Sequence, residues 1–173
     1  MRTLSLLRHA KSSWDDERLA DVERPLAPRG SKAAPRMGRH MREIGVVPDL
    51  VLCSPARRTR ETADLVLPCL AGPPPRLLHD PAIYEATVEE LMAVLRRVGP
   101  EVAHALLIGH NPGLQELAIV LTEGTDSEDR RAIAEKLPTT ALVVIDLAIT
   151  DWGEISGGKG RIRHLATPRM LAD

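Results

Sequence analysis

The sequence predicts an α/β fold with a mainly parallel sheet and helices on both of its faces. Apolar runs of strand length alternate with longer segments of helical character along the 173 residues, which is typical of βαβ units. Histidine or arginine residues follow three of these apolar runs, and ligands of such sheets bind beyond the carboxyl ends of the strands. We therefore expect one domain over residues 1–173, with its functional site at that edge of the sheet.

The first half of the chain is expected to contain two strands and two helices. In order, these are a strand over 3–8, a helix over 30–44, a strand over 49–53, a helix over 55–69 and a proline-rich loop over 71–81. Ser54 followed by Pro55 is typical of an N-cap with proline at the first helical position. The loop of about twenty residues after the first strand is unusually long, and such loops are often functional.

The second half continues the alternation. In order, it predicts a helix over 87–98, a strand over 104–109, a helix opened by Pro112, a polar helix over 126–136, a strand over 141–147 and a strand near 161–165. Thr87 and Glu90 have the spacing of a capping box, which marks a helix start.

The composition restricts the classes of function. The chain has two Trp, one Tyr and no Phe, so we expect an aliphatic core, and its net charge of −1 gives no overall attraction for nucleic acid or membrane. Cys53 and Cys69 lack a C-x-x-C spacing, so we expect reduced thiols. The first apolar run is too short for a signal peptide or a membrane span, and a cytoplasmic location is expected.

His9 directly follows the first strand and is the candidate nucleophile. A neutral imidazole can attack phosphorus and form a phosphohistidine intermediate, provided that one ring nitrogen is free and the other is fixed by a hydrogen bond. A lone histidine at a strand end is more often structural, but Arg8 beside it and His110 after a later strand favour the catalytic interpretation.

Arg8 and Arg58 are the candidate phosphate-binding cations, because a guanidinium matches phosphate oxygens in pairs and stays charged. Arg58 is expected in the first turn of its helix, where free backbone N–H groups also favour an anion. Arg24 and Lys11 are candidates for further cations of the same pocket. A solvated basic face is the alternative for the arginines of the second helix, Arg57, Arg58 and Arg60.

His110 lies between Gly109 and Asn111, ahead of a predicted helix. A protonated His110 would stabilise charge on the transferring phosphoryl group, and Asn111 is grouped with the substrate-binding residues. Glu85 is the candidate general acid, although a glutamate near a helix start is also favourable for dipole reasons alone. Four acidic loop residues lack a recurring metal-ligand spacing and are interpreted as partners of basic residues or as solvated charge: Asp15, Asp16, Asp21 and Glu23.

These segments resemble a known family. Residues 7–10, Leu-Arg-His-Ala, resemble the Arg-His-Gly motif of the histidine phosphatase superfamily, and residues 54–63 resemble its Ser-Pro-x-x-Arg segment. Residues 109–111 resemble its Gly-His segment. The Arg-Pro-Leu at residues 24–26 and the small size are similar to the SixA-type phosphohistidine phosphatases of that superfamily.

The resemblance implies a phosphoglycerate mutase-like, three-layer α/β/α fold with one antiparallel strand, and no metal or cofactor. It implies that His9 accepts the phosphoryl group while Arg8, Arg58 and His110 bind it. Three departures from the family pattern stand out. Ala10 replaces a glycine, Glu61 replaces a glutamine, and the position of the acid varies among SixA-like proteins, so Glu85 transfers poorly.

Three functions remain open from the sequence. The first is a phosphatase acting on phosphohistidine or another phosphoprotein. Only 51 residues separate Arg58 from His110, which leaves little room for an inserted cap domain, and an open pocket favours a phosphate on a protein surface. The second is a phosphatase of small phosphomonoesters, and a mutase is disfavoured because the substrate would have to be enclosed. The third is a catalytically silent phosphate-binding module, which would not need His9. The partner is thus a phosphorylated protein or small substrate, with no nucleic acid or membrane, and the oligomeric state is open.

Overall fold

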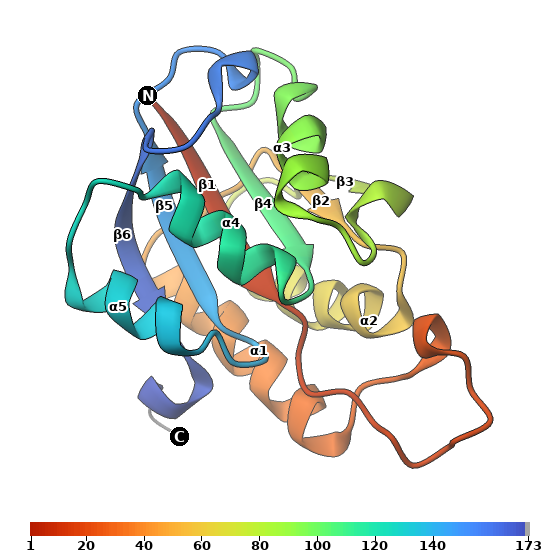
Figure 1. The fold of residues 1–173 in the computed structure, drawn as a ribbon. Coiled ribbons are helices and arrows are strands. Elements are labelled where there is room, and N and C mark those ends of the chain that lie inside the picture. The colour runs from red at the N-terminus through yellow and green to blue at the C-terminus, as the bar shows by residue number, and fades with distance from the viewer. Residues whose placement is uncertain (172–173) are drawn as a thin grey trace.

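A six-stranded sheet forms the middle layer of the computed structural model, which describes residues 1–171 (Figure 1). Its strands are β1 (Arg2–Arg8), β2 (Leu50–Cys53), β3 (Arg76–His79), β4 (His104–Gly109), β5 (Leu142–Leu147) and β6 (Gly160–Ala166). They lie in the order β3-β2-β4-β1-β5-β6. β5 is antiparallel to both of its neighbours, and the other pairings are parallel. The mainly parallel sheet with one antiparallel strand is therefore confirmed.

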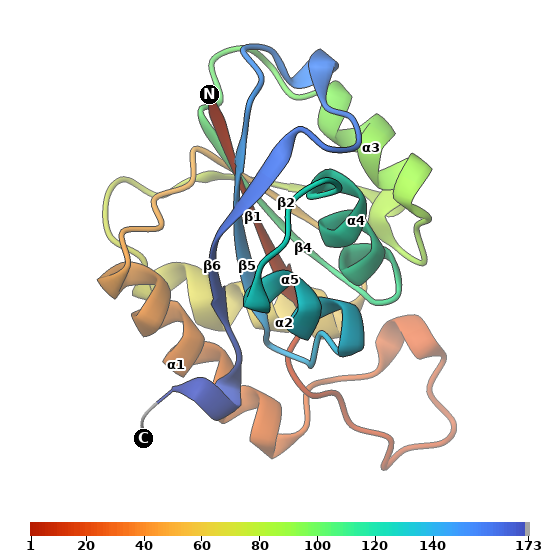
Figure 2. The same ribbon diagram turned by 60° about the vertical axis from the view of Figure 1, so that its left-hand side comes forward.

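Helices cover both faces of the sheet (Figures 1 and 2). The α-helices are α1 (Pro28–Glu43), α2 (Arg57–Val66), α3 (Val88–Arg96), α4 (Gly113–Leu121) and α5 (Glu128–Glu135). Short 3₁₀ turns are η1 (Asp21–Glu23), η2 (Leu67–Cys69), η3 (Pro81–Ile83), η4 (Trp152–Glu154) and η5 (Pro168–Met170). α1 and α2 pack on one face, and α3, α4 and α5 pack on the other. This is the expected three-layer α/β/α arrangement.

The strands are apolar on both sides because each face is covered. Along β1, Leu4 and Leu6 belong to the core under α3 and α4, whereas Leu7 belongs to the core under α1 and α2, as the two-residue period of a strand requires. The core is aliphatic as expected, apart from the fully buried Trp152, whose Nε1 donates to the Val102 carbonyl at 2.7 Å.

Two boundaries in the first half differ from the prediction. The segment 71–81 is not all loop, since it contains β3, an edge strand with mostly exposed side chains that lacks the apolar pattern of a buried strand. Ser54 is not the N-cap of α2, since its hydroxyl contacts Nε2 of His110 at 2.7 Å and accepts from the Ala56 amide at 3.3 Å, ahead of the helix. α2 instead begins at Arg57 after Ala56, so Arg58 still lies in its first turn.

In the second half, the capping box of Thr87 and Glu90 is confirmed. Pro112 is the N-cap of α4 and not its first residue. Cys53 and Cys69 are free thiols, as expected. Within residues 1–171 no helix is long and apolar enough to cross a membrane, and the cytoplasmic location stays a prediction.

The register of three parallel strands positions the site. In the pairing of β1 with β4, Arg8 lies opposite Gly109, and in the pairing of β2 with β4, Cys53 lies opposite Ile108. The residues that follow these strands therefore emerge side by side at one edge of the sheet. Two backbone bonds lock this edge: the amide of His9 donates to the Gly109 carbonyl, and that of Ser54 donates to the Ile108 carbonyl, both at 3.1 Å.

Candidate active site

His9 is fixed in one tautomer at the end of β1. Its Nδ1 lies 2.8 Å from the carbonyl oxygen of Ala10, and since a carbonyl only accepts, Nδ1 must carry the proton. Nε2 is then the nitrogen with a free lone pair. The side chain is buried, and burial is the largest of the effects that lower the pKa of His9 to about 3, with His110 and Arg8 adding to it. The imidazole is neutral near pH 7, as a nucleophile must be.

His110 faces His9 across the site, with ring centroids 5.4 Å apart and planes tilted by 54°. Its Nε2 contacts the Ser54 hydroxyl at 2.7 Å, and its Nδ1 is buried without a partner among residues 1–171. Burial and the nearby Arg58 lower the pKa of His110 to about 4. His110 is therefore neutral in the protein alone, and its protonation beside a transferring phosphoryl group, which supplies the negative charge, stays a prediction.

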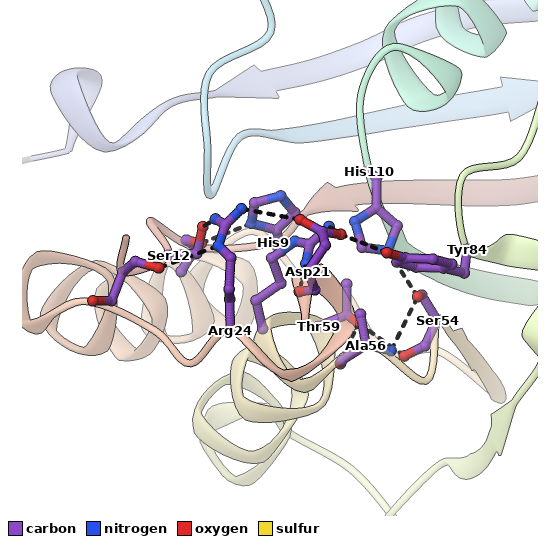
Figure 3. Close-up of polar contacts among 12 residues, drawn as sticks. His9, Ser12, Asp21, Arg24, Ser54, Ala56, Thr59, Tyr84 and His110 are labelled. Carbon is purple, nitrogen blue, oxygen red and sulfur yellow. Dashed lines mark hydrogen bonds and ion pairs between the residues drawn. The ribbon is translucent and has the colours of Figure 1, made fainter. Parts of the chain in front are cut away.

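Arg58 reaches toward the long loop and binds Asp21 through two groups. Its guanidinium donates to the Asp21 carbonyl at 2.9 Å and to the Asp21 carboxylate at 3.0 Å. The same carboxylate accepts from the Tyr84 hydroxyl at 2.5 Å and from Arg24 at 3.1 Å. Figure 3 shows Asp21 between Arg24 and Tyr84. The hydrogen bond from Tyr84, together with Arg58, lowers the pKa of Asp21, so it is a carboxylate at neutral pH.

Arg8 contributes a second cation to the same edge. It donates to the Leu137 carbonyl at 3.0 Å, and its Nε is buried without a partner within residues 1–171. Burial and repulsion from Arg58 lower the pKa of Arg8. Two guanidiniums and two neutral imidazoles thus gather where β1, β2 and β4 end, which is an arrangement suited to a phosphoryl dianion.

The remaining predicted residues fall into two groups. Glu85 and Asn111 line a cavity of about 440 Å³ together with Arg58 and His110, so both are near the site as expected. Asn111 donates to the Leu137 carbonyl at 2.8 Å. Lys11, in contrast, is exposed and lines a different groove, so it is not part of this cavity, and its role in substrate binding stays a prediction.

Arg24 is near the site without facing it. Its side chain is buried, donates to Ser12, to the Ser13 carbonyl and to Asp21, and stacks on the ring of Trp14. Arg24 acts on the site indirectly, because Arg24 and Arg58 both form an ion pair with Asp21. As a direct phosphate ligand, Arg24 stays a prediction.

The interpretation of the acidic loop residues as partners of basic residues holds for two of them. Asp21 pairs with Arg24 and Arg58, and Asp16 pairs with Arg18. Sequence reasoning did not find the contacts of Asp21 and Ser54 in the site, and it missed Tyr84 altogether. Tyr84 is the only tyrosine of the chain and directly precedes Glu85, but no sequence pattern indicates that it reaches the loop.

Two departures from the family pattern have structural explanations. Ala10 is fully buried, and its methyl group is part of the core under α1 and α2. Its amide donates to the Thr62 hydroxyl at 3.0 Å. Glu61 accepts from the backbone of Leu26 at 2.8 Å and from Arg57 at 3.3 Å, which ties the long loop to α2.

Solved structures share this fold. The proposed phosphohistidine phosphatase SixA of Nakamurella multipartitia matches with a TM-score of 0.83 and 24% identity, covering 96% of each chain. A protein histidine phosphatase SixA complexed with tungstate matches with a TM-score of 0.77 and 24% identity, covering 96% of this chain and 97% of that chain. The expected phosphoglycerate mutase-like fold is thereby confirmed.

Sequence comparisons place the chain in a family. An uncharacterized protein of Mycobacterium tuberculosis is 34% identical over 165 residues, which is 94% of this chain and 100% of that relative. Residues 4–93 match the sequence model of the histidine phosphatase superfamily, branch 1, and this range includes Arg8, His9 and Arg58. The chain belongs to that superfamily.

Proposed function

We propose that this protein is a phosphatase that uses His9 as nucleophile and acts on phosphohistidine or on another phosphoprotein. Membership of the histidine phosphatase superfamily and the SixA-like fold support a phosphatase. The observation that carries the mechanism is the neutral ring of His9, with Nδ1 bound to the Ala10 carbonyl and Nε2 left as the free nitrogen.

In the first step, Nε2 of His9 attacks phosphorus in line. A nitrogen–phosphorus bond forms while the bond from phosphorus to the leaving group breaks. Arg8, Arg58 and His110 stabilise the charge on the phosphoryl oxygens, and the negative charge beside His110 favours its protonation. The cations all belong to the chain, so the proposal invokes no metal or cofactor.

The Asp21 carboxylate must release the Arg58 guanidinium when the substrate binds. A phosphoryl dianion that reaches Arg58 competes with the Asp21 carboxylate for the same guanidinium, and it brings more charge. The leaving group takes a proton from Glu85 or from water. Water then attacks the phosphohistidine, which releases inorganic phosphate and restores the neutral imidazole.

A small phosphomonoester is the second candidate substrate. The cavity of about 440 Å³ beside His110 lies within the size range of small-molecule sites. A silent phosphate-binding module is disfavoured, because phosphate binding alone does not require a free Nε2 on His9.

The test is phosphate release in the presence of a chelator. Wild-type protein and His9→Ala are offered a phosphohistidine-bearing protein and a panel of phosphometabolites. Release from the phosphoprotein that the variant loses supports the proposal, as does an acid-labile phosphoryl label on the wild-type chain. Release from metabolites only moves the function to small phosphomonoesters. Phosphate binding without any turnover supports the silent module.

A further inference from the structure

A groove of about 580 Å³ beside the candidate active site is strongly basic. Its lining comprises Lys11, Arg29, Lys32, Ala33, Arg36, Lys136, Pro138, Thr139, Thr140, Thr167, Pro168 and Arg169. Six of these residues are cationic and none is acidic, although the whole chain has a net charge of −1. The positive charge is therefore concentrated locally. We call this feature the basic groove.

The topology explains why the basic groove adjoins the nucleophile. Because β5 runs opposite to β1, and β6 runs parallel to it, the residues before β5 and after β6 lie at the edge where β1 ends. Figure 2 shows η5, after β6, beside α1. The amide of Thr140 donates to the carbonyls of Arg8 and His9 at 3.1 and 3.0 Å, and Lys11 is two residues beyond His9.

The first turn of α1 is fitted closely against Lys11. The amide of Ala27 donates to the Lys11 carbonyl at 2.8 Å. A Cβ atom on Gly30 would lie 2.2 Å from that carbonyl oxygen, so only glycine allows this approach. This close contact holds the backbone of Lys11 against the start of α1, from which Arg29 and Lys32 line the same groove.

The cations form a row along α1. Arg29, Lys32 and Arg36 are spaced by three and four residues, which places them on one helix face. Seven residues of helix span about 10 Å, close to the length of three residues of extended chain. Lys136 and Arg169 add two cations to the lining from outside α1. Among residues 1–171, the cations of the basic groove other than Arg36 make no ion pair. Their charge is therefore available to an acidic partner.

The exposure of these cations favours a protein segment over a small polyanion. Lys11, Arg29, Lys32, Lys136 and Arg169 are all solvent-exposed. Small-molecule sites bury most of their ligand and fix it with a few placed polar groups, whereas exposed charges of one sign orient and accelerate the encounter with a protein of opposite charge. We propose that the basic groove binds an acidic segment of the phosphoprotein substrate, next to its phosphorylated residue. This inference rests on the proposed function and adds to it the feature by which the substrate is selected.

The test compares two short phosphohistidine peptides, one with glutamates and one with glutamines flanking the phosphorylated residue. The double variant Arg29→Glu/Lys32→Glu reverses two charges of the groove. Arg39→Glu/Arg42→Glu makes the same charge change on exposed positions of α1 that do not line it. We expect wild type and the control to prefer the glutamate peptide by roughly tenfold in kcat/KM, and the groove variant to lose this preference. Equal use of both peptides by wild type, or equal loss in the control, overturns the inference.

A second measurement separates this inference from the proposed function. Fluorescence anisotropy follows binding of the labelled glutamate peptide with an unphosphorylated histidine, so it needs no turnover. If wild type binds this peptide and the groove variant does not, the inference holds even where no phosphate is released from any substrate. No binding by wild type, or tighter binding of inorganic triphosphate or of a single-stranded oligonucleotide than of the peptide, overturns it.

Discussion

Lowering the pH from 7.5 to 5.0 should strongly reduce the free energy of unfolding, because three histidines that are buried or partly buried are neutral in the folded protein. These are His9, His104 and His110. Burial is the largest effect on each ring and lowers the pKa values to about 3, 4 and 4. His104 is paired with the Ser5 hydroxyl at 2.7 Å, away from the active-site edge.

Proton linkage gives the sign and size of this change in the free energy of unfolding. A histidine whose pKa is lowered by folding takes up its proton more readily in the unfolded chain. Its contribution to stability is therefore complete above the unfolded pKa of about 6.5 and is lost as the pH falls toward the folded value. At pH 5 each ring costs about 2 kcal/mol, so the three together cost about 6 kcal/mol. Domains of this kind have unfolding free energies of about 5–15 kcal/mol, so acid unfolding should begin near pH 5.

Urea unfolding followed by circular dichroism between pH 7.5 and 5.0 measures this effect. Near pH 5 these three rings should contribute an uptake of about three protons on unfolding. His104→Asn should reduce the proton uptake on unfolding by about one proton, whatever it does to absolute stability. An unfolding free energy that is flat over this range would refute the neutral state of the buried rings, and with it the argument for His9 as a ready nucleophile.

Four further predictions concern turnover and phosphate binding. Arg58→Lys removes the bidentate guanidinium donor, so kcat/KM for phosphate release should fall roughly ten- to a hundredfold; an unchanged value would contradict the role of Arg58 in binding the phosphoryl group. Asp21→Asn removes the competing carboxylate, so the inhibition constant of inorganic phosphate should fall by up to about fivefold, as expected for an ion pair whose carboxylate is 43% exposed; weaker phosphate inhibition would instead show that Asp21 positions Arg58. Ser54→Ala leaves Nε2 of His110 without its partner, and kcat should fall roughly tenfold while the melting temperature shows that the fold is intact; full kcat would separate this contact from catalysis. Glu85→Gln should reduce kcat on a phosphomonoester by roughly 10²-fold or more and change phosphohistidine turnover far less, because a nitrogen leaving group needs less help; equal losses on both substrates would contradict this.

Much of the fold follows from local patterns in the sequence. β1, β2, β4 and β5 are mostly apolar, because helices cover both faces of the sheet, and such runs are visible without a structure. β3 was missed for the opposite reason. As an edge strand with mostly exposed side chains it has no apolar pattern, and the three prolines before it indicate a loop.

The site was predictable where residues follow strands directly. His9, Arg58 and His110 are placed by strand ends and by the first turn of α2, so their chain positions fix their location. Residues in the long loop have no such constraint. Asp21 and Lys11 both belong to it, yet Asp21 binds Arg58 while Lys11 lies in the basic groove. Which way a loop side chain turns depends on tertiary partners such as Tyr84, and these are distant in sequence.

The contact between Asp21 and Arg58 also accounts for how two guanidiniums are kept at one edge of the sheet. Arg8 and Arg58 repel each other, and this repulsion contributes to the lowered pKa of Arg8. The Asp21 carboxylate offsets part of that cost, but its single charge is shared with Arg24 and Tyr84, and its side chain is 43% exposed, which weakens each interaction. A phosphoryl dianion presents a second charge and more oxygens to Arg8 and Arg58, and charge interactions are stronger at a buried group such as Arg58. A phosphoryl dianion, the group that the site is proposed to bind, thus offsets the repulsion between the two cations better than one carboxylate does. This favours phosphate over a carboxylate as the ligand.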